Sequence, residues 1–256
     1  MKATERALVA GQLALLGFSA MGGVMLSDQA DWSPPGLFAL LLVVAVVSEA
    51  FRLETKTFHI SAAFLSLVLA MTLLGPSPAA GLGVVVMGVN ALRRHAPWRH
   101  TVANVSTYAF FPLVGGAVFE SVGGPSLLNT NAATYILLVF ALFMTMNIVN
   151  FLLIAVDIAI VDGQSIPSSV RRIFLPVLPV EFATGLLTAG VAFGYQDRNI
   201  AAVGLLAIVG LVFQYLLRTA LTSMESKDEL EGRTRELAAL QVGLLGTVLQ
   251  TLSLRD

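Results

Sequence analysis

Eight apolar runs, separated by short polar connections, dominate this chain. A helix needs roughly 17–25 mostly apolar residues to cross the ~30 Å hydrocarbon core of a bilayer. Most of the runs reach that length, although the second, third and fourth are short for full spans. The pattern predicts an all-α membrane protein with about eight transmembrane helices, at residues 7–26, 36–51, 60–74, 79–92, 102–122, 132–161, 173–195 and 200–221.

The composition excludes several other classes of protein. Hydrophobic residues make up 56% of the chain and charged residues 12%, whereas a soluble domain is nearer 45–50% apolar and ~25% charged. Lys and Arg number 15 against 16 Asp and Glu, so the basic excess that nucleic-acid binding requires is absent. With no cysteine and three histidines, we predict no metal and no cofactor. The expected partner is the lipid bilayer.

Basic residues sort to alternate connections between the runs. If both termini are cytoplasmic, fourteen of the 15 Lys and Arg residues fall in inside segments, and Arg198 alone falls outside. Cytoplasmic loops of membrane proteins carry such an excess. The bias predicts a multi-pass protein with both termini in the cytoplasm and an even number of spans. In the outer connections, the Pro76-Ser-Pro78 segment predicts a tight turn.

The last 34 residues differ from the rest, which divides the chain into a transmembrane domain at 1–222 and a tail at 223–256. The tail has an imperfect heptad pattern of leucines, and two Glu–Arg pairs at i,i+4 spacing that support a helix. We expect a marginal cytoplasmic linker or coiled-coil helix that forms a homodimer. The two pairs are Glu229/Arg233 and Glu231/Arg235.

Polar residues inside the apolar runs are the candidate site residues, because ionisable groups in hydrocarbon are costly. Asn147, Asn150 and Asp157 are spaced to share one face of the sixth run. They are either interhelical hydrogen-bonding groups or a stripe that binds a small ligand or an ion. Glu181 follows Pro176 and Pro179, where it either lines a cavity beside irregular backbone or stabilises a helix N-terminus.

Two further residues complete the candidate ligand-binding set. Glu49 ends the second run and is either an interfacial carboxylate paired with Arg52 or the acid of a ligand site. Asn104 and Asn90 flank a basic loop at 93–100, which either contacts anionic lipid or binds an anionic ligand. The chain has no GxxxxGK[ST] or HExxH motif and no assembled Ser–His or Asp–Asp set, so we predict no catalytic residue in it.

The tail carries a family resemblance. The run from 231 to 256, ending in Leu252-Ser-Leu-Arg255-Asp256, resembles the helix that leads into HD-GYP and related HD-type phosphohydrolase domains of bacterial signalling proteins. In that family the first metal-binding histidine follows within a few residues, and this chain stops before it. The upstream region is similar to multi-pass membrane input regions of such proteins at Leu73-Leu-Gly-Pro-Ser-Pro-Ala79, Asn104-Val-Ser-Thr-Tyr108 and Leu178-Pro-Val-Glu181.

The resemblance implies a sensory module in the bacterial inner membrane. It implies that the parent protein is a metal-dependent cyclic-dinucleotide phosphodiesterase, with its output domain absent from this chain and its ligand unknown. The alternative is a small-molecule transporter or its membrane subunit, with Asn147, Asn150, Asp157 and Glu181 as binding groups. A membrane-embedded enzyme is the third hypothesis.

Overall fold

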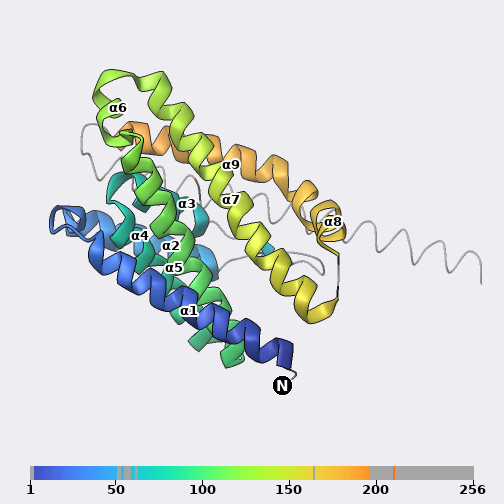
Figure 1. Cartoon of the computed structure of the whole chain (residues 1–256). Coiled ribbons are helices and arrows are strands. Elements are labelled where there is room, and N and C mark those ends of the chain that lie inside the picture. Colours follow the sequence, from blue (N-terminus) through green and yellow to red (C-terminus); the bar gives the residue numbers. More distant parts are fainter. Residues whose placement is uncertain are drawn as a thin grey trace, which may run out of the picture. The chain divides into compact units, whose positions relative to one another are not determined.

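The computed structural model describes residues 3–50, 53–54, 59–60, 63–163, 165–195 and 210, and these are almost entirely helical (Figure 1). Contacts divide the chain into two units, Met1–Leu211 and Val212–Asp256, and every described residue belongs to the first. The eighth predicted run, apart from Gly210, lies outside the described residues, as does the predicted linker helix at 223–256. The predicted domain boundary therefore stays a prediction.

Seven of the predicted runs correspond to helices. These are α1 (Ala3–Met25), α2 (Pro35–Ala50), α3 (Ala63–Leu73), α4 (Pro76–Arg94), α5 (Trp98–Ser121), α7 (Ala132–Asp162) and α9 (Leu175–Gly194). Short elements lie between them: the 3₁₀ turn η1 (Ala30–Trp32), an antiparallel pair of two-residue strands β1 (Leu53–Glu54) and β2 (His59–Ile60), α6 (Gly124–Thr130), α8 (Ile166–Ser169) and the π-helical turn η2 (Val170–Phe174).

Four helices in the described part of the chain are long and apolar enough to cross a membrane. Their spans are Arg6–Met25, Trp98–Ser121, Ala132–Ile160 and Leu175–Gly194, within α1, α5, α7 and α9. Helices α2 and α3 are apolar but shorter. The predicted all-helical class, with several helices able to span a membrane, is confirmed. The number of eight spans stays a prediction.

Helix α3 forms the centre of the described core. Its 11 residues measure about 16 Å at 1.5 Å per residue, roughly half of the hydrocarbon thickness. Residues 63–72 are all buried, and α3 contacts α2, α4, α5, α7 and α9. A helix that is apolar on every side is a core helix. The Phe64 ring illustrates the packing, since it stacks on Phe111 of α5 and meets Phe143 of α7 edge-on.

Helices α4 and α5 approach each other closely at Gly83. Pro112 has no N–H, so the Tyr108 carbonyl one turn earlier cannot receive the regular helical hydrogen bond. Gly83 of α4 lies against this carbonyl oxygen, and a Cβ atom at position 83 would overlap it. Gly116 of α5 lies similarly against the backbone of Pro76. Backbone contact, made possible by glycine, therefore joins the two helices.

The start of α4 corrects one sequence prediction. Pro76 and Pro78 do not form a tight turn between helices; they lie in the first turn of α4. Proline is tolerated there, because the N–H groups of a first helical turn have no intrahelical partner. The chain reverses instead at Gly75, whose φ of +103° favours glycine.

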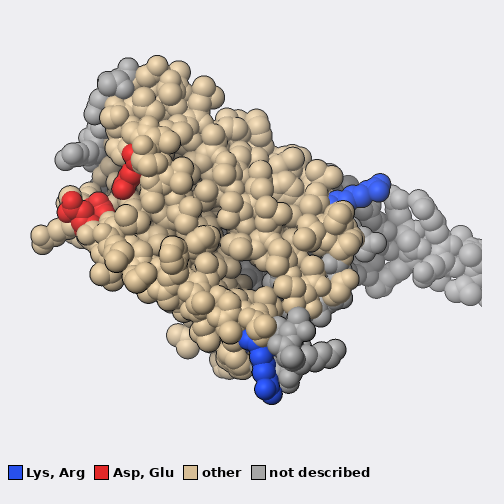
Figure 2. Space-filling model, in the orientation of Figure 1, with Lys and Arg blue, Asp and Glu red and all other residues tan. Residues whose placement is uncertain are grey.

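Two acidic residues and two basic residues lie at opposite ends of helix α4. Gly75 precedes α4, and its environment includes the carboxylates of Glu120 and Asp31; we call this the acidic end. The last turn of α4 carries Arg93 and Arg94, and we call that the basic end. In the view of Figure 2, Asp and Glu lie at one end and Lys and Arg at the other.

Candidate functional site

A carboxylate–carboxamide hydrogen bond connects α7 to α9. The Asn147 side chain donates from Nδ2 to Glu181 Oε2 at 2.7 Å, and the pair is partly buried. Both residues lie inside spans that are apolar enough to cross a membrane. The structure thus places in direct contact two of the candidate residues that the sequence nominated, although 34 positions separate them.

Asn150 extends this polar site by one turn of α7. Its Oδ1 atom is buried and has no hydrogen-bond partner among the described residues. Leaving such an acceptor unpaired costs roughly 1–3 kcal/mol, which makes Asn150 a candidate for contact with a ligand. We define the α7–α9 polar site as Asn147, Asn150 and Glu181.

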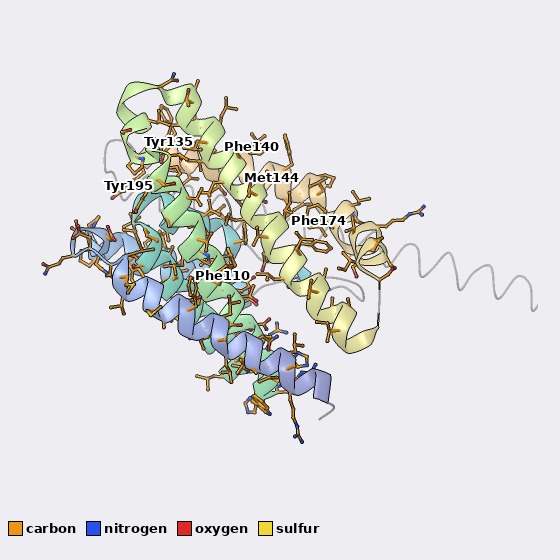
Figure 3. All side chains as sticks on the ribbon, in the orientation of Figure 1. Phe110, Tyr135, Phe140, Met144, Phe174 and Tyr195 are labelled. Atoms are coloured by element: carbon orange, nitrogen blue, oxygen red, sulfur yellow. The ribbon has the colours of Figure 1, made fainter. Side chains whose placement is uncertain are left out.

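Aromatic pairs close the α7–α9 interface on both sides of the polar site. Phe140 and Phe182 meet edge-on with ring centroids 4.9 Å apart, and Phe151 and Phe174 are 4.8 Å apart. Figure 3 shows Phe140 and Met144 along α7 and Phe174 at the turn that precedes α9. Apolar walls reduce the local dielectric constant, which strengthens any charge-assisted bond that the polar site makes.

The backbone just before α9 is irregular, as the prolines predict. Residues Val170–Phe174 form a π-helical turn, and the Leu175 N–H donates to the Val170 carbonyl. Pro176 then follows at the start of α9, with Pro179 inside it. Turns of this type occur frequently at functional sites. Helix α9 begins at Leu175, so Glu181 lies beyond its first turn, and the alternative of a first-turn acid is wrong.

A second glutamate–asparagine bond connects α2 to α4. Asn90 Nδ2 donates to Glu49 Oε1 at 3.1 Å, and Asn90 and Glu49 are 7% and 3% exposed. Glu49 makes a further polar interaction besides this bond, whereas Asn90 Oδ1 has no hydrogen-bond partner in the described part of the chain. The sequence missed Asn90 as the partner; the signal available was one isolated polar residue near the same end of each run.

The other candidate residues do not join the α7–α9 polar site. Asn104 is exposed on α5. The backbone of Asp157 lies on α7, within about 80° of Asn147 at 3.6 residues per turn, but its side chain lies outside the described residues, as does Arg52. The described residues include no group of three or more His, Cys, Asp or Glu side chains that could hold a metal ion.

Comparison with known proteins identified no similar protein. No protein-family model matches the sequence, and neither the curated proteins nor the solved structures contain a significant match. The chemistry of the polar site is therefore the basis for assigning a function. A carboxylate, a carboxamide donor and a carboxamide acceptor without a partner in the described part of the chain can bind a proton, a small cation or a hydrogen-bonding ligand.

Proposed function

We propose that this chain is the membrane sensory module of a bacterial signalling protein, and that the α7–α9 polar site receives the signal. The output is an HD-type cyclic-dinucleotide phosphodiesterase domain that follows Asp256. The protein spans the inner membrane eight times, has both termini in the cytoplasm and forms a homodimer through residues 223–256. The separation of acidic and basic ends supports this topology.

The observation that carries the proposal is the buried Asn150 Oδ1 atom, which has no partner among the described residues and lies one helical turn from the Asn147–Glu181 bond. A ligand that satisfies Asn150, or a change in the charge of Glu181, alters the hydrogen bonding between α7 and α9. Two packed helices respond to such a change by a small translation or rotation. The irregular turn at Val170–Phe174 is the place where α9 can shift without moving α7.

Connectivity gives the signal a route to the output. Helix α9 leads along the chain to the eighth predicted run at 200–221 and then to the predicted linker helix at 223–256. A transmitted rotation depends on the phase of that helix. Inserting one residue after Gly232 turns everything beyond it by about 100°, so we expect the insertion to change output activity, and no change would contradict transmission through a continuous helix.

The receptor role is tested by removing the charge of Glu181. In the protein joined to its output domain, Glu181→Gln should change the rate of cyclic-dinucleotide hydrolysis by about fivefold or more, the usual size of coupling between sites. Glu120→Gln is the matched control, because Glu120 is an exposed carboxylate at the acidic end. Equal activities of both variants and the parent would overturn the assignment.

The reading frame beyond Asp256 separates this proposal from the transporter alternative. A histidine- and aspartate-containing metal domain there supports the sensory module. A transporter would use the same polar groups for transport, and it has no need of a heptad helix ahead of an output domain. Two results together would favour the transporter. The reading frame would encode no output domain, and the parent protein would accumulate a solute in vesicles while its Glu181→Gln variant would not.

A further inference from the structure

A cavity of about 400 Å³ lies beside α1, remote from the α7–α9 polar site. Small side chains on facing helices leave this space unfilled. A Cβ atom added at Gly23 would meet no atom within 4 Å. The principal lining residues come from four elements: Ala20 and Gly23 from α1, Trp32 from η1, Ala80 and Gly81 from α4, and Ala109 from α5.

The polar side chains that line the cavity are already hydrogen-bonded within the protein. Ser19 Oγ donates to the Leu15 carbonyl at 2.8 Å, and Ser77 Oγ donates to the Gly23 carbonyl at 2.7 Å. The Trp32 indole N–H donates to Ser27 Oγ at 3.1 Å.

Most of the polar groups of the wall are thus engaged within the protein, and the other lining residues are apolar. A polar ligand would lose its hydrogen bonds to water on entering and would gain few in return, at a cost of about 1–3 kcal/mol for each group left unpaired. The cavity selects an apolar occupant.

The position of the cavity indicates which apolar molecule reaches it. Helix α1 can span a membrane, and 11% of its apolar window is buried in the protein, so most of the helix faces lipid. The lining runs along α1 from Leu16 to Val24, about 12 Å at 1.5 Å per residue. One leaflet contributes about 15 Å of hydrocarbon. Trp32 borders the cavity at the acidic end, in keeping with the preference of tryptophan for the membrane interface.

We propose that this cavity binds one acyl chain of a phospholipid from the leaflet at the acidic end. The acyl chain enters between α1 and α4 and lies against the small residues of both helices. The phospholipid headgroup remains beyond Trp32, at the level of the interface. The site is independent of the α7–α9 polar site and of the function proposed for it.

The test uses the full chain in vesicles of phosphatidylethanolamine and phosphatidylglycerol that contain a phospholipid with a photoreactive acyl chain. Illumination should attach the probe mainly to peptides of α1 and α4 that line the cavity. Gly23→Leu fills the cavity and should reduce this labelling about tenfold, because excluding two methylene groups costs that much affinity. Gly17→Leu is the matched control, since Gly17 lies on the same helix and does not line the cavity.

Ala20→Leu provides a second filling variant if Gly23→Leu does not fold, because Ala20 lines the cavity and is exposed, so a leucine side chain at position 20 can extend into the cavity. Labelling that is unchanged in a folded filling variant, or spread evenly over α7 and α9, overturns the proposal.

Discussion

Two glutamate–asparagine bonds lie in regions of different packing. The Glu49–Asn90 bond lies where α2 and α4 pack with the buried helix α3, and its residues are almost fully enclosed. The Asn147–Glu181 bond joins α7 and α9, beside a π-helical turn, and remains partly accessible. Burial makes the first bond a structural constraint, and accessibility allows the second to respond to a ligand. The same pair of side chains thus serves two purposes according to its surroundings.

The largest expected effect comes from breaking the close contact in the first region. Gly83→Ala places a methyl group on the Tyr108 carbonyl, so α4 and α5 must separate, at a cost of about 3 kcal/mol in the free energy of unfolding. Gly88→Ala, on the same helix, meets no atom and should be neutral or stabilising by up to about 1 kcal/mol. Unfolding in mixed detergent micelles measures both, and equal stabilities would contradict the described contact.

A smaller effect separates the two bonds directly. Asn90→Ala removes one of the polar interactions of the enclosed Glu49 carboxylate and should lower the free energy of unfolding by about 2 kcal/mol, while Asn147→Ala should lower it by about 1 kcal/mol, because the Asn147–Glu181 pair is only partly buried. The same unfolding assay compares them. If Asn147→Ala is the more costly change, the contrast in burial does not determine the roles of the two bonds.

The smallest effect on stability is expected at Asn150. Asn150→Leu removes an acceptor that has no partner in the described part of the chain, so its free energy of unfolding should stay within about 0.5 kcal/mol of the parent or rise. The same variant should abolish control of the output domain, because functional groups are commonly kept at the expense of stability. A large loss of stability with normal signalling would show that Asn150 is a packing residue.

The sequence predicted the helices well because hydrophobic periodicity and length are local properties. It predicted irregular backbone before α9 from Pro176 and Pro179, since a missing N–H acts within one turn. It placed Pro76 wrongly because a proline suits both a turn and a first helical turn.

The contacts between distant residues could not be predicted in the same way. The sequence grouped Glu181 with Asn147 as candidate binding residues without predicting the bond between them, and it missed Asn90 as the partner of Glu49. Nothing in a single sequence specifies which faces of two helices meet. The cavity beside α1 was missed for the same reason, because it exists only where small residues of two helices face each other.

The most direct test of the account locks α7 to α9. The chain contains no cysteine, so Phe140→Cys and Phe182→Cys, at positions whose rings lie 4.9 Å apart, introduce one thiol pair that a short bifunctional thiol reagent can cross-link. With the output domain attached, hydrolysis is compared with Glu181 intact and in the Glu181→Gln background. We predict that the two activities differ before cross-linking and become equal once the pair is cross-linked. A difference that persists in the cross-linked protein would contradict signalling through movement between these helices.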